Sequence, residues 1–128
     1  MLADSHFGFA LVERRGVPIV KVFGEVDLLA SHALCNALAG LATDHHASVV
    51  VDLSWVPFFD STGLSALAAG HKRMQANDGE LRVVVTDPNV RIVFQLGALD
   101  RAIPIFDNLE DAISWRGSSE FAQGQVAG

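Results

Sequence analysis

The sequence has few of the features that mark secreted or nucleic-acid-binding proteins. A single cysteine, Cys35, excludes an internal disulfide and gives no sign of an oxidising compartment. The net charge of −6 argues against nucleic acid or an anionic membrane as the main partner, because both attract basic patches. Residues 1–5 also lack the basic region and apolar stretch of a signal peptide. We therefore expect a cytoplasmic protein that does not contact nucleic acid directly.

The sequence also lacks an uninterrupted apolar run long enough to cross a membrane. Residues 48–70 contain only two charged side chains, Asp52 and Asp60. However, Pro57 and Gly63 interrupt this window, and a carboxylate near the centre of a bilayer is costly. A strand, a turn and a helix describe the window better, so we expect no membrane span.

The length and composition favour one domain. The chain has 128 residues, and half of them are apolar, which is enough for a sizeable core. Residues 117–128 are rich in glycine, serine and glutamine and are typical of a flexible tail. We expect a domain over residues 1–116 followed by a flexible tail over residues 117–128.

Hydrophobic periodicity predicts an α/β fold with the element order β-β-α-β-α-β-α-β-α. A turn at Arg15–Gly16 joins the first two strands as a hairpin, and the later alternation implies parallel strands with right-handed crossovers. The predicted strands cover residues 6–13, 17–23, 48–53, 81–85 and 103–106. The predicted helices cover residues 28–42, a segment from Leu64 to Met74 that ends at the turn 77–79, a segment from Pro88 to about Gly97, and a last helix around Leu109–Ile113.

The two faces of the predicted sheet differ in polarity. In the strand at 48–53, Val49, Val51 and Leu53 oppose a face that carries Ser48 and Asp52. A sheet covered on both faces reads as continuously apolar. We therefore expect a mixed, mostly parallel sheet with helices mainly on one face and the other face partly open to solvent.

Four aspartates follow predicted strands and precede predicted helices. They are Asp27, Asp60, Asp87 and Asp107. The carboxyl ends of parallel strands meet at one edge of a sheet, where open α/β folds place functional groups. Helix capping accounts for Asp87 and Asp107, because aspartate is a favoured N-cap residue, and Asp107 stands at capping-box spacing from Glu110. A metal site is a weaker interpretation, since a hard cation needs several converging oxygens.

The stretch "FFDSTGL", residues 58–64, holds more polar groups than one helix cap requires. Asp60, Ser61 or Thr62 alone would cap the helix, and Gly63 weakens its first turn while allowing another backbone to approach. One interpretation is a structural turn. The other is a covalently modified serine, whose phosphate would face free N–H groups at the start of the helix.

With this loop, the sequence resembles a known family, the STAS domains, and among them the bacterial anti-sigma factor antagonists. The resemblance lies in "FFDSTGL" after the strand "VVVDLS", in "GEVD" at 24–27, and in "LGALDRAIPIF" at 96–106. It extends from about Phe7 to Trp115, which is nearly the whole chain.

The resemblance implies a phosphorylation-controlled binding protein. Such proteins sequester an anti-sigma factor that is also an ATP-dependent serine kinase, and so free a sigma factor for transcription. Phosphorylation, which the resemblance places on Ser61, breaks the complex, and a serine phosphatase restores it. We expect no cofactor and no metal. The partner-binding residues that it implies are Asp27, Asp60, Ser61, Thr62, Gly63 and Leu64.

Two alternatives remain at the level of sequence. A STAS-like domain also serves as a scaffold, a small-ligand binder or a transport-accessory subunit, none of which needs the switch. An enzyme with Ser61 as nucleophile would need a base within reach, and the G-x-S-x-G elbow and the G-x-x-x-x-G-K-[ST] loop are both absent. His71 lies near the apolar face of the second predicted helix and is expected to be a packed residue. We therefore expect no enzymatic activity.

Overall fold

The structure is a computed structural model that describes residues 7–42 and 48–115. It confirms the predicted order of strands and helices and adds one short 3-10 helix, η1. The expected tail at 117–128 and the histidines at 45 and 46 lie outside the described residues. The elements are β1 (Phe7–Arg14), β2 (Val17–Gly24), α1 (Leu28–Ala42), β3 (Ser48–Trp55), α2 (Ser61–Ala76), β4 (Glu80–Val84), α3 (Pro88–Leu96), η1 (Leu99–Arg101), β5 (Ile105–Phe106) and α4 (Leu109–Ser114).

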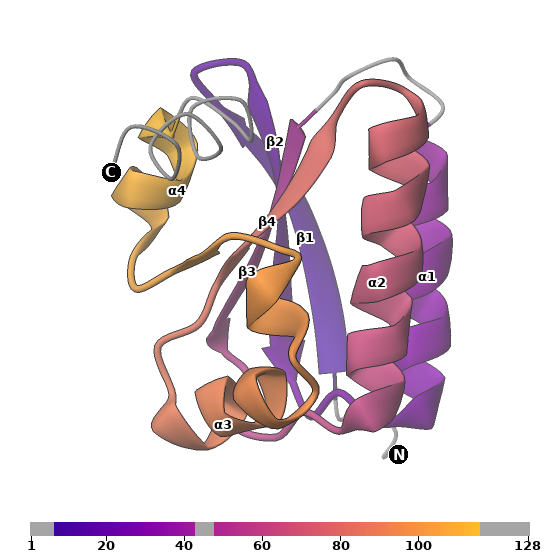
Figure 1. Cartoon of the computed structure of the whole chain (residues 1–128), viewed down its shortest axis with the longest axis vertical. Helices are drawn as coiled ribbons and strands as arrows, with labels where there is room; N and C mark the ends of the chain where they lie inside the picture. The colour runs from indigo at the N-terminus through magenta and orange to yellow at the C-terminus, as the bar shows by residue number, and fades with distance from the viewer. Residues whose placement is uncertain (1–6, 43–47, 116–128) are drawn as a thin grey trace.

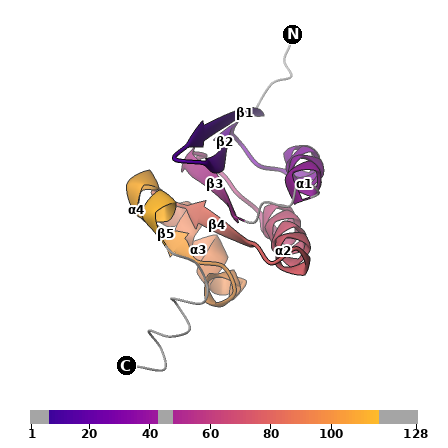
Figure 2. The same ribbon diagram turned by 90° about the horizontal axis from the view of Figure 1, so that it is seen from above.

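The five strands form one sheet (Figure 1), and the view in Figure 2 shows their order, β1-β2-β3-β4-β5. β1 and β2 pair antiparallel, and the remaining neighbours pair parallel. Arg15 and Gly16 have φ values of 54° and 80°. This is the left-handed conformation that a two-residue hairpin turn requires, so the predicted hairpin is confirmed.

Helices α1 and α2 lie together on one face of the sheet, and α4 lies on the other (Figure 2). The larger core cluster, between the sheet and α1 and α2, also includes residues of α3. The prediction of helices mainly on one face is therefore confirmed. In the described residues, no helix is long and apolar enough to cross a membrane.

The expectation of a partly open second face is wrong at the centre of the sheet. Asp52 and Arg82 lie on that face but are only 4% and 5% exposed. The Arg82 guanidinium donates hydrogen bonds to Glu80, at 3.1 Å, and to the Ala112 carbonyl of α4, at 2.8 Å. It also lies 5.4 Å from the centroid of the Trp115 ring. Arg82 is therefore buried beneath α4 with hydrogen-bond partners, and Asp52 is buried with hydrogen-bond partners on its own strand.

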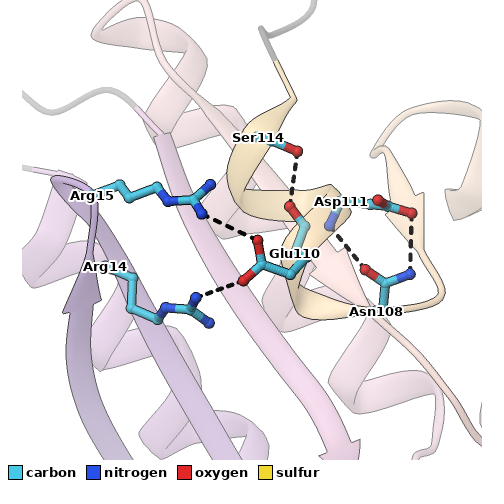
Figure 3. Close-up of polar contacts among 6 residues, drawn as sticks. All are labelled: Arg14, Arg15, Asn108, Glu110, Asp111 and Ser114. Carbon is cyan, nitrogen blue, oxygen red and sulfur yellow. Dashed lines mark hydrogen bonds and ion pairs between the residues drawn. The ribbon is translucent and has the colours of Figure 1, made fainter.

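Two ion pairs connect α4 to the β1–β2 hairpin (Figure 3). The carboxylate of Glu110 lies 2.5 Å from a guanidinium nitrogen of Arg14 and 3.4 Å from one of Arg15. All three side chains are largely exposed, so the pairs contribute little to stability, at most about 1 kcal/mol each. They place the hairpin turn next to α4.

The predicted capping residues are correct for α3 and wrong for α4. The side chain of Asp87 accepts a hydrogen bond from the Asn89 N–H at 2.8 Å, with Pro88 at the first helical position. Asp107 instead forms an ion pair with Arg91 at 2.5 Å. Asn108 has the extended backbone of an N-cap and caps α4 through the N–H of Asp111, at 2.9 Å. The helix begins one residue later than the capping-box spacing predicted.

The outer edge of β4 is covered partly by a side chain. β5 has only two residues and pairs with Val83 and Val84. Beyond it, the N–H of Leu81 donates to Nδ1 of His71, at 3.2 Å. His71 is buried, as predicted, and takes the place of a carbonyl from a longer fifth strand.

Candidate functional site

The loops that follow β2 and β3 lie side by side at the carboxyl edge of the sheet. Val26 and Phe59 form an isolated parallel bridge, and the Val26 N–H donates to the Phe58 carbonyl at 2.9 Å. Each bridge residue directly precedes one of the aspartates, Asp27 and Asp60. The expectation that these two acidic residues share one edge is therefore confirmed.

Asp60 caps helix α2. Its backbone is extended, and its Oδ1 accepts hydrogen bonds from the N–H of Thr62, at 3.0 Å, and of Gly63, at 3.3 Å. The hydroxyl of Thr62 donates to the same oxygen. One carboxylate oxygen therefore satisfies donors that the first turn of a helix would otherwise leave unpaired.

Ser61 is the first residue of α2 and is exposed. In the described part of the chain, its hydroxyl has no hydrogen-bond partner, while its carbonyl accepts from the Ser65 hydroxyl at 3.2 Å. The sequence had suggested that a phosphate here would meet free N–H groups. That expectation is wrong for Thr62 and Gly63, whose N–H groups already bind Asp60. A phosphate on Ser61 would instead lie beside a carboxylate.

Gly63 is needed because of an aromatic side chain and not, as expected, because of a neighbouring backbone. A Cβ atom at this position would lie 2.6–3.0 Å from three atoms of the Phe59 ring. That ring stacks on Phe94 of α3, with 5.2 Å between centroids and 14° between planes. The glycine therefore allows the loop to pack on the core through Phe59. Leu64, next in the sequence, is half-buried.

Asp27 caps helix α1 and is half-buried. Its Oδ1 accepts from the Ala30 N–H at 3.1 Å. Its carbonyl accepts from the N–H of Ser31, at 2.8 Å, and from the Ser31 hydroxyl, at 2.7 Å. Asp27 therefore satisfies donors at the start of α1 with both its side chain and its carbonyl.

Ser31 is a residue of the site that sequence reasoning missed. It is 2% exposed, and its Oγ lies 2.9 Å from the Thr62 Oγ1 of the neighbouring loop. A serine inside a helix gives no signal in a periodicity pattern. The one feature of the sequence that pointed to Ser31 was its position, four residues after Asp27 and on the apolar side of α1.

Large apolar side chains are exposed at the same edge. Four of them, between 48% and 70% exposed, come from the start of α1, the end of β3 and the loop before α2. We call them the apolar rim: Leu28, Leu29, Trp55 and Phe58. Two further exposed side chains, Ile92 and Leu96, belong to α3. Exposed apolar groups gathered in this way are typical of protein-binding surfaces.

The described residues contain no group of three or more side chains that could hold a metal ion. Of the four junction aspartates, Asp27, Asp60 and Asp87 accept hydrogen bonds from helix N–H groups, and Asp107 pairs with Arg91. The edge therefore carries the exposed Ser61 hydroxyl and the exposed side chains of the apolar rim.

The chain is similar, in sequence and in structure, to bacterial anti-sigma factor antagonists. The anti-sigma-F factor antagonist RsfB of Mycobacterium tuberculosis is 30% identical over 114 residues, which are 89% of this chain and 93% of RsfB. The crystal structure of an anti-sigma factor antagonist from Mycobacterium paratuberculosis is 32% identical, with a TM-score of 0.78 over 84% of this chain and 92% of that one. Unphosphorylated SpoIIAA, an anti-sigma factor antagonist, shares the fold at 21% identity and a TM-score of 0.64, over 94% of this chain and 99% of its own. The model of the STAS domain matches residues 9–112, and the chain belongs to the STAS domain family.

Proposed function

We propose that this chain is an anti-sigma factor antagonist whose binding is controlled by phosphorylation of Ser61. The unphosphorylated protein binds an anti-sigma factor that is also a serine kinase, and phosphorylation releases it. A serine phosphatase returns the protein to the binding form. The role of antagonist is supported by the names of RsfB and of the paratuberculosis protein.

The main support for the proposal is the exposed Ser61 hydroxyl, which has no hydrogen-bond partner among residues 7–42 and 48–115 and lies on the same sheet edge as the apolar rim. Apolar side chains at the centre of a protein interface contribute much of its binding energy, and charged groups are depleted there. The unmodified Ser61 hydroxyl is small and neutral. It therefore fits the unphosphorylated state as the binding state.

Phosphorylation would change this surface through charge. A phosphoserine carries about −1.5 to −2 charges at pH 7. On Ser61 it would lie beside the carboxylate of Asp60, whose Oδ1 already binds the nearest N–H groups. Burying that charge against the apolar rim and a partner is unfavourable, because the phosphate would lose water without gaining the helix N–H groups. SpoIIAA, which shares this fold, has been solved in both an unphosphorylated and a phosphorylated form.

The experiment measures binding and modification together. The chain is incubated with each anti-sigma factor kinase encoded in the same genome, with and without ATP, and is then examined by calorimetry, intact mass and site mapping. Ser61→Ala should bind its partner as the wild type does and acquire no phosphate. Ser65→Ala, which removes another exposed hydroxyl one turn further along α2, should be phosphorylated normally.

Two results would contradict the proposal. Undiminished phosphate on Ser61→Ala would place the modification elsewhere. Binding without any phosphorylation of the wild type would favour a scaffold that does not switch.

A further inference from the structure

The hydroxyl of Thr62 is held from two sides, unlike that of its neighbour Ser61. It donates to the Asp60 carboxylate and lies 2.9 Å from the Ser31 Oγ. Ser31 in turn lies 2.7 Å from the Asp27 carbonyl oxygen. The result is a chain of four oxygen atoms that joins the two loops of the site.

Only two hydroxyl protons serve the three contacts in this chain, because Ser31 and Thr62 each carry one. When Thr62 donates to Asp60, the proton of Ser31 points either to Thr62 or to the Asp27 carbonyl. When Thr62 donates to Ser31, the proton of Ser31 goes to Asp27. In every arrangement Thr62 Oγ1 faces an oxygen of Asp60 and the oxygen of Ser31.

Phosphoryl transfer requires an accessible hydroxyl. The hydroxyl oxygen forms a bond to the γ-phosphorus of ATP, the bond from that phosphorus to the β–γ bridging oxygen breaks, and the electron pair leaves with ADP while the hydroxyl proton passes to solvent. Thr62 is half-buried, and its Oγ1 would have to turn away from Ser31 to reach ATP. Ser61 is exposed and has no such contact to lose within the described residues.

We infer that Ser31 is a positioning residue that holds Thr62 in one rotamer and thereby restricts modification of the loop to Ser61. The part of this inference that concerns modification rests on the proposed function. The part that concerns the rotamer does not. Ser31 is suited to this task because it is buried and its backbone is fixed in α1 by the N–H bond to Asp27.

The first test needs no partner protein. Three-bond NMR couplings to the Thr62 methyl carbon report its χ1 rotamer, and they should show one rotamer in the wild type. Ser31→Ala should shift the rotamer ratio roughly fivefold, which corresponds to a net hydrogen-bond energy of about 1 kcal/mol. Ser31→Cys should act similarly with little change of volume, because a thiol is a weak donor. The control Ser65→Ala should leave the couplings unchanged.

The second test maps phosphate with the same set of genome-encoded anti-sigma factor kinases and ATP. In Ser61→Ala, Thr62 should remain unmodified. Adding Ser31→Ala to that variant should produce detectable phosphate on Thr62, because the freed side chain then reaches other rotamers. Adding Ser65→Ala instead should not.

The two tests distinguish the positioning of Thr62 by Ser31 from the restriction of phosphorylation to Ser61. Unchanged couplings in both Ser31 variants overturn the inference. Changed couplings without any gain of phosphate on Thr62, in a protein that is phosphorylated on Ser61, overturn the restriction to Ser61. If no kinase modifies the wild type, the proposed function fails, and the couplings alone decide whether Ser31 positions Thr62.

Discussion

Leu64 occupies the space that a side chain at Gly97 would need. A Cβ atom on Gly97 would lie 2.5 Å from Cδ1 of Leu64, so the first turn of α2 and the end of α3 are in direct contact. Leu64 is one of the residues proposed to bind the partner. A change at Gly97 therefore acts on this surface without touching Ser61.

Gly97→Ala should reposition Leu64 while leaving the fold intact. Gly97 has a φ of −85°, which alanine adopts readily, and the atom in conflict is the end of a flexible side chain. We expect a melting temperature within a few degrees of the wild type and a weaker complex with the anti-sigma factor, measured by calorimetry. Normal affinity in this variant would remove Leu64 from the binding surface.

Gly63→Ala should destabilise the protein much more than Gly97→Ala. The new methyl group would meet three ring atoms of Phe59, which is buried and stacked on Phe94. Overpacking of this kind costs about 1–3 kcal/mol, measurable by urea unfolding. The control is Gly40→Ala in α1, where the new Cβ would meet no atom of the described residues within 4 Å outside the helix's own backbone, and stability should rise by up to about 1 kcal/mol. Equal effects at the two glycines would contradict the packing found around Phe59.

Ser61→Asp should fold but bind the anti-sigma factor poorly. The introduced carboxylate lies next to Asp60, which already binds the nearest helix N–H groups, so we expect a small loss of melting temperature and not a gain. Ser61→Asn is the matched control because it has nearly the same size without the charge, and it should bind more tightly than Ser61→Asp. Comparable affinities for the two variants would show that size, and not charge, controls release.

Asp27→Asn should distinguish the helix-capping role of Asp27 from the effect of its negative charge. Asparagine caps helices about as well as aspartate, so the bond to the Ala30 N–H and the melting temperature should be retained. Removing the negative charge should change the rate of phosphorylation or the affinity for the partner, measured by mass spectrometry and calorimetry. If both stay at their wild-type values, Asp27 is a helix cap and nothing more.

His71 should make stability depend on pH. Burial lowers the pKa of His71, and the nearby Glu80 carboxylate partly opposes this effect. Because the folded-state pKa lies below the unfolded value of about 6.5, the contribution is complete above that pH and is lost as the pH falls through the lowered pKa. The wild type should therefore lose stability between pH 7.5 and pH 5 more steeply than His71→Gln. Exposed His32 provides the control, and a slope as flat in His32→Gln as in His71→Gln would argue against this origin.

The sequence predicted the features that depend on local patterns. Strand and helix order follow from periodicity, the hairpin from Arg15–Gly16, and the caps from aspartates at the ends of strands. The error at α4 arose because Asp107 and Asn108 are both good caps, and only the backbone conformation shows which residue starts the helix. The three-residue helix η1 is too short to produce a periodic signal.

The features that were missed depend on contacts between distant segments. The burial of Asp52 and Arg82 was not predicted, because alternation does not distinguish a solvated polar residue from a buried one with hydrogen-bond partners. Likewise, the contact between Ser31 and Thr62 joins residues 31 positions apart. The parallel pairing that brings them together was predicted, but not the rotamers that make them touch.

The bond between His71 and Leu81 also limits how far the sheet can grow. β5 is too short to pair with the whole of β4, and a backbone N–H left unpaired on the edge of a sheet is a place where another strand can add. The imidazole of α2 occupies that donor as long as Nδ1 is unprotonated. Because Leu81 is fully buried, protonation of that nitrogen would leave its N–H unpaired inside the protein, so acid would weaken the edge of the sheet from within.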